Sequence, residues 1–300
     1  MKRIALLLDL EESKYQKLLA SRAFERAAQL GFGILGPAYA GGSSFTQLDQ
    51  LHGFTREAER VDAVVLSVAG TASDLPIAKR TCRSGVCFVY LNRIPAHLGE
   101  LREAFPDVLV SGVTPDQEAV GRIQAAQCER LAPNGGFVVL VTGVRSSASA
   151  KARERGFLAA AGARFRCHVI DGRWTANGAA KAFVDWFRLG VERKQDIAVV
   201  ACQNDEMARG ARAALAEHAR ETGTPSLLEV PIVGCDGLVD EGQRMVREGE
   251  LAATIVIPVT TPTALDQLAA FWGKSEKPPV AVLAPESFPP LHGLRASVRR

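Results

Sequence analysis

Short apolar runs alternate with amphipathic stretches along the whole chain. Most of the apolar runs are nearly continuous in Val, Ile and Leu, which is typical of parallel strands covered on both faces. The stretches between them repeat apolar residues at helical spacing, as between Tyr15 and Leu30, where Gly31 is placed to end the helix. We predict strands at Arg3–Asp9, Phe32–Gly36, Ala63–Val68, Val86–Asn92, Val108–Gly112, Phe137–Thr142, Arg166–Asp171, Ile197–Gln203, Val230–Cys235, Ala252–Ile257 and Val280–Ala284.

Strands that alternate with helices in this way form parallel sheets with right-handed crossovers. They fall into two series, one from residue 3 to about residue 110 and one from Gly112 to about residue 256. The tail after Pro258 adds a helix over Thr263–Trp272 and one more strand. No low-complexity linker separates the series. We therefore predict an α/β protein with two doubly wound parallel-sheet lobes, joined by several chain crossings rather than by one flexible tether.

Composition and charge exclude two classes of function. Lys plus Arg is 36 against 33 for Asp plus Glu, and a net charge of +3 is too small to indicate a nucleic-acid-binding surface. No run of about 18 apolar residues occurs, so we expect no membrane insertion. Asp9 interrupts the first apolar run, which favours a buried strand over a secretory leader. As the chain stands we expect a cytoplasmic protein, or a periplasmic one if a leader has been removed.

The usual signatures of catalysis and of metal binding are missing. The sequence has no P-loop, no GxSxG and no HExxH, and its five histidines are scattered. Gly31–Gly36 spells GxGxxG, but it follows a helix instead of opening one, so we do not expect a dinucleotide site. The six cysteines lack CxxC spacing, and Cys202 and Cys235 lie in apolar runs, which indicates free thiols. We expect no catalytic residue, no metal and no cofactor.

Polar residues follow several of the predicted strands directly. Asn92-Arg93, Asn204-Asp205 and Asp236-Gly237 each come at a strand end, and we expect Arg153 to open the helix after the Phe137–Thr142 strand. Ligands of open α/β sheets bind at these carboxyl ends. Taken singly, each residue fits a helix cap or the surface, but together they supply the donors and acceptors that a ring of hydroxyls needs. The flat side chains of Tyr15 and Trp174 would suit the apolar faces of such a ring.

The segment Gly41-Gly42-Ser43-Ser44 allows two interpretations. It precedes a helix, so its backbone could bind an anion at the helix N-terminus. A turn followed by a capping serine is the favoured alternative.

Similarity to a known family is found in the opening stretch, from Ile4-Ala5-Leu6-Leu7 through Leu30-Gly31-Phe32, and in Arg153–Phe157, Asn204–Ala211, Ile232–Gly237 and Glu248–Ile255. They resemble the type I periplasmic binding proteins of the ribose-binding class, to which the sugar-sensing domains of LacI/GalR repressors are related. The resemblance covers nearly the whole chain and implies two lobes joined by three hinge crossings. It places these crossings near Ser111–Val113, Ile257–Pro258 and Leu283–Pro285, which gives an N-terminal lobe of 1–111 plus 258–283 and a C-terminal lobe of 112–257 plus 284–300.

The resemblance also assigns ligand-binding residues position by position. Stacking is assigned to Tyr15 and Trp174, and hydrogen bonding to Arg93, Arg153, Asn204 and Asp236. Four further positions depart from the family pattern: Ser13 replaces an Asn, Gln16 an aromatic residue, Asn92 an acid and Ile257 a polar hinge residue. These changes remove one carboxylate and one or two amides, and they favour a deoxy, modified or non-sugar polyol ligand over plain ribose.

The function implied by the resemblance is non-catalytic binding of a small polar ligand, a sugar or polyol, in a cleft between lobes that close about the hinges. The protein would be the substrate-binding component of an ABC-type sugar transporter or a sugar sensor. Its partners would be an ABC permease or a signalling protein, with no nucleic acid, and we expect a monomer. The alternative is the ligand-sensing domain of a LacI-class regulator that lacks its DNA-binding segment. An enzyme would need a nucleophile or an acid–base pair, which Asp236 alone does not provide.

Overall fold

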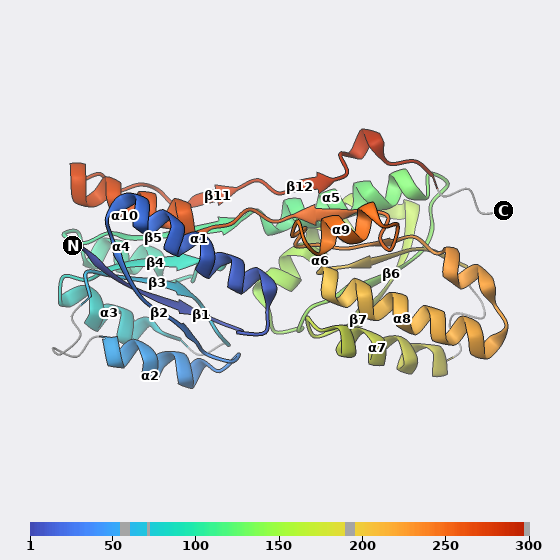
Figure 1. Cartoon of the computed structure of the whole chain (residues 1–300), viewed down its shortest axis with the longest axis horizontal. Helices are drawn as coiled ribbons and strands as arrows, with labels where there is room; N and C mark the ends of the chain where they lie inside the picture. The colour runs from blue at the N-terminus through green and yellow to red at the C-terminus, as the bar shows by residue number, and fades with distance from the viewer. Residues whose placement is uncertain (55–60, 71–72, 190–195, 297–300) are drawn as a thin grey trace. The chain divides into compact units, whose positions relative to one another are not determined.

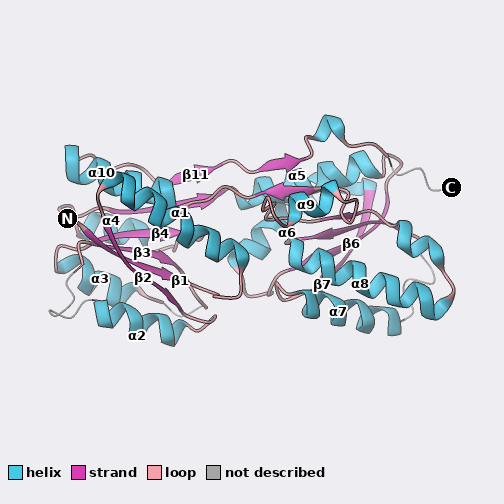
Figure 2. Cartoon of the chain, in the orientation of Figure 1, coloured by secondary structure: helices cyan, strands magenta, loops and turns pink. Residues whose placement is uncertain are grey.

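The computed structural model describes residues 1–54, 61–70, 73–189 and 196–296. The chain divides into two compact units, Met1–Pro115 with Pro258–Leu283 (unit 1) and Asp116–Ile257 with Ala284–Arg300 (unit 2). Both units combine parallel strands with helices, so the predicted α/β class is confirmed (Figure 2). The lobes expected from the sequence include 55–60, 71–72, 190–195 and 297–300, which lie outside the described residues.

Unit 1 is built on one six-stranded sheet with the order β11-β5-β4-β3-β1-β2. All its strand pairs are parallel, and the residues of the central strand β1 are almost fully buried after Arg3. Figure 1 shows α1 beside α10 on one face of the sheet and α2 beside α3 on the other. The elements are β1 (Arg3–Leu8), α1 (Lys14–Leu30), β2 (Gly33–Tyr39), α2 (Ser44–Phe54), β3 (Ala63–Ser67), α3 (Leu75–Arg83), β4 (Cys87–Leu91), α4 (Leu98–Ala104), β5 (Val110–Pro115), α10 (Thr261–Lys274) and β11 (Ala281–Leu283).

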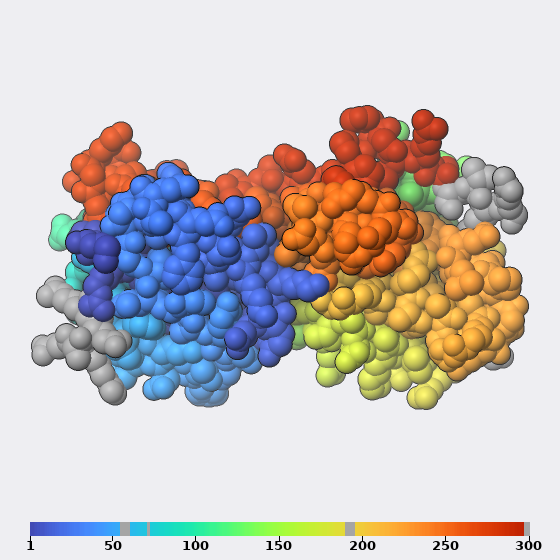
Figure 3. All heavy atoms as spheres, viewed as in Figure 1, coloured from blue at the N-terminus to red at the C-terminus, as the bar shows by residue number. Residues whose placement is uncertain are grey.

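Unit 2 has a four-stranded parallel sheet with the order β7-β6-β8-β9 and a two-stranded antiparallel pair, β10-β12. Helices α5 and α6 pack together, as do α7 and α8, and each pair contributes to its own apolar cluster. One side of α9 is visible in the space-filling view (orange, Figure 3), while its Gly242 and Met245 are buried. The elements are α5 (Gln117–Leu131), β6 (Gly136–Thr142), α6 (Ala148–Ala161), β7 (Phe165–Asp171), α7 (Ala176–Arg188), β8 (Ile197–Cys202), α8 (Asp205–Thr222), β9 (Ile232–Val233), α9 (Gly242–Arg247), β10 (Thr254–Val256) and β12 (Glu286–Phe288).

Both sheets contain a switch point, where successive strands are added on opposite sides of the first strand. In unit 1 the first strand is β1, flanked by β2 and β3; in unit 2 it is β6, flanked by β7 and β8. The helices that follow such strands diverge to opposite faces, and the crevice at the carboxyl ends is where ligands of open α/β sheets bind.

The structure differs from the sequence prediction at the end of β5. We assigned residues 112–115 to the second lobe, but Val113, Thr114 and Pro115 pair with β11, and Val113 also pairs with β4. Because these ladder bonds hold the whole of β5 in the first sheet, the division of the chain falls after Pro115. Strand β12 was not predicted, since its three residues are half-buried or exposed and carry no apolar run.

Several local predictions are confirmed. Gly31 ends α1 in the left-handed conformation, with φ of 70°. Ser43 Oγ accepts a hydrogen bond from the Thr46 backbone N–H at 3.2 Å, so the interpretation of 41–44 as a turn with a capping serine is correct. All six cysteines are free, and Cys202 and Cys235 are fully buried.

In the part of the chain that the structure describes, no helix has the length and apolar character that spanning a bilayer requires.

Candidate functional site

In unit 1, two of the predicted site residues lie at the start of α1. Ser13 is the N-cap of this helix, and its Oγ accepts a hydrogen bond from the Gln16 backbone N–H at 3.4 Å. Tyr15 is half-buried, and its hydroxyl donates to the carbonyl oxygen of Pro258 at 3.0 Å. The hydroxyls of Ser13 and Tyr15 therefore serve the protein itself, and the Tyr15 ring is the part suited to a ligand.

The amides of Gln16 and Asn92 are joined through Ser67 at the end of β3. Both side-chain nitrogens donate to Ser67 Oγ at 3.4 Å. Asn92 Oδ1 accepts from Thr260 Oγ1 at 3.0 Å and lies 3.4 Å from the oxygen of the Tyr15 hydroxyl. The backbone of Asn92 is left-handed, with φ of 63°, a conformation that Asn tolerates better than most residues. These bonds make both amides part of the scaffold of unit 1.

Arg93 keeps most of its hydrogen-bonding capacity. Its Nη1 donates to the carbonyl oxygen of Gly70 at 2.9 Å, and no other side-chain bond of Arg93 is formed among the described residues. Burial lowers the pKa of Arg93, while the carboxylates of Asp74 and Asp9 oppose this shift. Arginine stays protonated in proteins, so the guanidinium remains a fork of charged donors.

Two acidic residues of unit 1 were missed by the sequence analysis. Asp74 is buried and accepts a hydrogen bond from the Tyr90 hydroxyl at 2.7 Å, with His97 Nε2 at 3.4 Å from its other oxygen. Asp9 is half-buried, directly after β1, and its Oδ1 accepts from the Gly42 backbone N–H at 3.1 Å. Burial raises the pKa of Asp9. We had taken Asp9 only as the end of an apolar run, although its place after the central strand was a usable signal.

In unit 2, Arg153 is buried, with 6% of its surface exposed, and it lies inside α6 instead of opening it, because Ser147 caps the helix earlier in the chain. Its Nε donates to Gln117 Oε1 at 2.7 Å, and its Nη1 donates to the carbonyl oxygen of Gln203 at 2.5 Å. The guanidinium carbon lies 5.5 Å from the centre of the Trp174 ring, within the range of a cation–π interaction. The Arg153 side chain is thus held in one position by α5, by the end of β8 and by Trp174, while its Nη2 donates to no described protein group.

Trp174 and Asn204 are held close together by the backbone. Trp174 is half-buried with φ of 64°, and a Cβ on Gly143 would lie 1.9 Å from its ring, so only glycine fits at 143. Asn204 is the N-cap of α8: its Oδ1 accepts from the Met207 backbone N–H at 2.8 Å, and its Nδ2 donates to the Trp174 carbonyl oxygen at 3.0 Å. The helix-cap interpretation of Asn204 is correct, since its amide is largely used by the protein.

Asp236 differs from the other predicted residues because no described protein group donates a hydrogen bond to its carboxylate. It is half-buried, with an unusual φ of 104°. Its backbone is fixed by a bond from its N–H to the Ile255 carbonyl oxygen at 3.0 Å and by one from the Ile257 N–H to its own carbonyl oxygen at 3.2 Å. Burial raises the pKa of Asp236 to about 7, although Arg153 works in the opposite direction. Ile257 itself is buried and apolar, with 4% exposed.

Asp205 supports the backbone turn at Asp236 and Gly237. The sequence analysis took Asp205 only as the opening of a helix. It is 1% exposed, and its two oxygens accept from Thr254 Oγ1 at 2.6 Å and from the Gly237 N–H at 2.8 Å. A Cβ on Gly234 or Gly242 would lie 2.1 or 2.0 Å from its oxygens. The carboxylate of Asp205 therefore fills the space that the two glycines leave and fixes the backbone next to Asp236.

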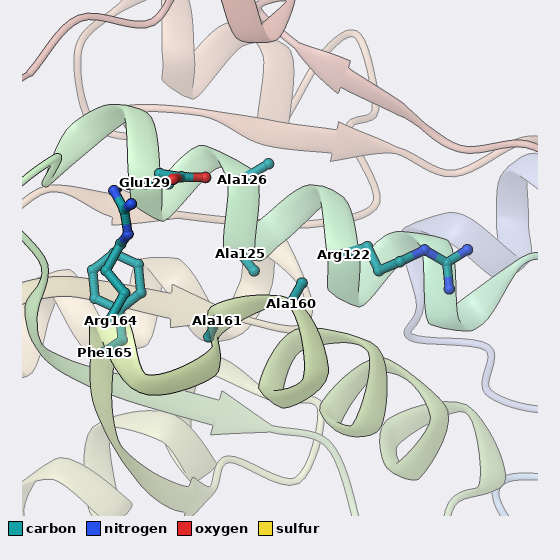
Figure 4. Close-up of a pocket in the computed structure, with 8 residues that line it drawn as sticks. All are labelled: Arg122, Ala125, Ala126, Glu129, Ala160, Ala161, Arg164 and Phe165. Carbon is teal, nitrogen blue, oxygen red and sulfur yellow. Dashed lines mark ion pairs between the residues drawn. The ribbon is translucent and has the colours of Figure 1, made fainter.

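Two hollows in unit 2 contain none of the predicted site residues. The smaller, about 90 Å³, lies between α5 and α6, where Ala125 and Ala160 line it and Arg164 forms an ion pair with Glu129 at 3.0 Å (Figure 4). The larger, about 530 Å³, is lined in part by Arg212, Val230 and Leu294. Within the described ranges no group of three or more His, Cys, Asp or Glu residues has metal-binding geometry.

Comparison with known proteins decides the family. The sequence profile described as "Periplasmic binding protein domain" matches residues 4–261. The chain belongs to this family. The resemblance to type I periplasmic binding proteins that we inferred from the sequence is confirmed.

Curated relatives match part of the chain. The "D-allose-binding periplasmic protein" of Escherichia coli (strain K12) is 29% identical over 190 residues, covering 60% of this chain and 55% of that protein. "Ribose import binding protein RbsB" of Salmonella typhimurium is 30% identical over 154 residues, covering 51% of this chain and 49% of the relative. These alignments span about half the length of the curated relatives. All the relatives named here are binding proteins.

Solved structures show that the fold is shared along nearly the whole chain. An ABC transporter periplasmic solute-binding protein from Actinobacillus succinogenes with bound D-allose has a TM-score of 0.81 at 20% identity, covering 96% of this chain and 97% of that one. The Caulobacter myo-inositol-binding protein, bound to myo-inositol, has a TM-score of 0.77 at 22% identity, covering 95% of this chain and 92% of that one. At these identities the likeness establishes the fold.

Proposed function

We propose that this protein binds a sugar or polyol and leaves it chemically unchanged. The observation that carries the proposal is the Asp236 carboxylate, half-buried and without a described donor, beside a fixed arginine and a flat aromatic ring. Burying a carboxylate without partners is costly, and ligand hydroxyls that donate to it would remove the cost. The names of the D-allose- and ribose-binding relatives support this class of ligand.

In unit 2, three residues have complementary roles in the proposed site. Asp236 accepts hydrogen bonds from hydroxyls, and Arg153 donates through Nη2. The half-buried Trp174 ring covers an apolar face of the ligand. Asn204, whose amide caps α8 and bonds Trp174, acts mainly by holding this ring in place.

In unit 1, Arg93 and the Tyr15 ring are the predicted residues best able to contact the same ligand. Ser13, Gln16 and Asn92 would form the support behind them, since their polar atoms already bond to the protein. A ligand contacted by residues of both units favours whichever arrangement lets both sets bind it at once. The changes in backbone angle would occur where the chain passes between units, at 115–116, 257–258 and 283–284.

For the biological role, we propose the substrate-binding component of an ABC-type sugar transporter. The description of one structural neighbour as an ABC transporter solute-binding protein supports it. In that role the protein would work in the periplasm, and its partner would be the membrane permease. A sugar sensor would use the same ligand-binding step with a signalling partner.

Calorimetric titration with D-allose, D-ribose, myo-inositol, D-fructose and L-arabinose tests the binding. At least one should bind, and Asp236→Asn should weaken that binding by about 10- to 100-fold, since each hydrogen bond to a charged group contributes roughly 1.5–3 kcal/mol. The matched control is Glu217→Gln, an exposed acid on α8, which should leave the affinity unchanged. Magnetic resonance of the recovered sugar should show no conversion. The absence of binding by every compound, or equal binding by the Asp236→Asn variant, would contradict the proposal.

A further inference from the structure

The direction of the Arg153 side chain depends on Gln117, a residue that the sequence analysis did not identify. Arg153 Nε donates a hydrogen bond to Gln117 Oε1 at 2.7 Å. Gln117 is half-buried and is the first residue of α5, whereas Arg153 is buried within α6. A hydrogen bond from a charged donor is stronger than one between neutral groups, so this contact restrains the guanidinium firmly.

The two helices that carry these residues meet backbone to backbone at two glycines. A Cβ on Gly121 of α5 would lie 2.0 Å from the carbonyl oxygen of Arg153. A Cβ on Gly156 of α6 would lie 2.1 Å from the carbonyl oxygen of Glu118, the residue that follows Gln117. Because close packing of this kind leaves neither helix room to shift, the backbone sets the position of the Gln117 side chain relative to Arg153.

The guanidinium of Arg153 is attached to the protein through Nε and Nη1. Nε is bonded to Gln117, and Nη1 donates to the carbonyl oxygen of Gln203 at 2.5 Å and to Cys235 Sγ at 3.4 Å. Because the group is planar and its donors form a rigid fork, attachment at both nitrogens fixes the direction of Nη2. With Nη1 alone attached, the plane could turn. The acceptor on Gln117 therefore determines where Nη2 points.

We infer that Gln117 is a positioning residue for sugar binding, whose amide oxygen holds Arg153 Nε so that Nη2 donates to one particular ligand hydroxyl. This inference rests on the proposed sugar-binding function and deepens it, since it assigns a role to a residue outside the predicted site. Without the Gln117 acceptor, Arg153 would keep its charge but lose its fixed direction. Affinity for the sugar and discrimination at that hydroxyl would then fall together, because both depend on a preorganised donor.

The test compares Gln117→Met and Gln117→Glu with the wild-type protein by calorimetric titration of the tightest-binding sugar of the panel. Gln117→Met has nearly the same length but no strong acceptor, and it should weaken binding by at least about 5-fold. Gln117→Glu keeps an acceptor oxygen and suits the first turn of a helix, so its affinity should stay within about 3-fold of the wild type. Gln29→Met is the matched control: Gln29 Oε1 accepts from the exposed Arg26 Nη1 at 2.7 Å, and its loss should leave binding unchanged.

The monodeoxy derivatives of the same sugar separate positioning of Arg153 from a general structural effect. The derivative that lacks the hydroxyl bonded by Arg153 should bind Gln117→Met within about 2-fold of its affinity for the wild type, because the contact that the substitution disturbs is already missing. A general loosening of unit 2 would instead weaken the parent sugar and every derivative alike. Circular dichroism of each variant establishes that it is folded, and Gln117→Ala takes the place of Gln117→Met if the latter does not fold.

The outcomes separate this inference from the proposed function. If Asp236→Asn weakens binding while Gln117→Met binds the parent sugar like the wild type, Arg153 does not need Gln117, and the proposed function stands without this inference. If Gln117→Met weakens the parent sugar and all derivatives equally, or if Gln117→Glu binds as weakly as Gln117→Met, Gln117 does not act through Arg153. If no sugar binds the wild type, the proposed function fails, and the role of Gln117 fails with it.

Discussion

The carboxyl edges of the two sheets use polar side chains in different ways. In unit 1, the half-buried amides of Gln16 and Asn92 both donate to the hydroxyl of Ser67, so they are bonded within the protein. In unit 2, one buried arginine, Arg153, is held by three parts of the unit, and the Asp236 carboxylate beside it is bonded by no described protein group.

This difference shows that unused hydrogen-bonding capacity, rather than residue type, distinguishes a residue that can bind a ligand from a scaffold residue, which only supports the fold. A polar side chain whose partners are all within the protein is already satisfied and stabilises the unit. A half-buried carboxylate without partners carries a free-energy cost that a ligand can remove. By this criterion we propose Asp236 as a ligand-binding residue, whereas Asn92 belongs to the scaffold of unit 1.

The largest expected effect is that of Arg153→Ala on stability. Removing this buried side chain leaves the Gln203 carbonyl oxygen and the Gln117 amide without their donor, and it also leaves a cavity. We therefore expect the free energy of unfolding to fall by about 4 kcal/mol. Arg93→Ala, which removes one bond to Gly70, should cost about 1 kcal/mol. Urea unfolding of both variants measures the comparison. If both variants lost the same free energy of unfolding, Arg153 and Arg93 would be bonded equally strongly within the protein, which contradicts our description.

Gly242→Ala should lower the free energy of unfolding by about 3 kcal/mol. The new Cβ would lie 2.0 Å from the buried Asp205 carboxylate, which supports the turn at Asp236. Gly273→Ala in α10 is the control: its Cβ would meet nothing within 4 Å, and alanine in a helix is favoured by about 0.5–1 kcal/mol over glycine. Urea midpoints should therefore shift in opposite directions. A wild-type midpoint for Gly242→Ala would mean that Asp205 can move away without cost.

Without ligand, Asp236→Asn should stabilise the protein by about 2 kcal/mol at pH 8. The pKa of Asp236 in the folded state, about 7, lies above its ordinary value of 3.8, so the folded protein binds the proton more tightly than the unfolded chain. Stability contributed by this group is therefore full below about pH 4 and is lost as pH rises to about 7. Partial contact with water keeps the effect below the full value of about 1.4 kcal/mol per pKa unit.

The measurement is the Tm of wild type and Asp236→Asn at pH 5 and pH 8. The difference in Tm between the two proteins should be larger at pH 8. A difference that does not change with pH would show that the carboxylate is as well solvated in the folded protein as in the unfolded chain, and the contrast between the two units would then be lost.

The smallest effect concerns a residue of the unit 1 scaffold. Ser13→Ala removes the N-cap of α1 and should lower the free energy of unfolding by about 1 kcal/mol. Ser21→Ala, at an exposed position inside the same helix, should be close to neutral. Thermal unfolding compares the two. If both were neutral, the hydroxyl of Ser13 would be free for a ligand, and it would move from the scaffold to the binding group.

The sequence by itself determined the alternation of strands and helices, the α/β class and the strand ends at which Asn92, Asn204 and Asp236 lie. Those features are local, since apolar periodicity, a left-handed Gly31 and capping by Ser13 and Ser43 depend on residues a few positions apart. The resemblance to a known family then supplied the roles of Tyr15, Arg153 and Trp174 as expectations.

Only the tertiary structure decided which polar atoms are already bonded and which are left over. Asn92 is satisfied by Thr260, far along the chain, and Asp205 by Thr254 and Gly237, so no local pattern could separate them from Asp236. The end of unit 1 at Pro115 was likewise decided by pairing with the distant strand β11. Hydrogen bonds between residues distant in sequence exist only once the sheets have formed, and for that reason the distribution of free donors and acceptors belongs to the fold.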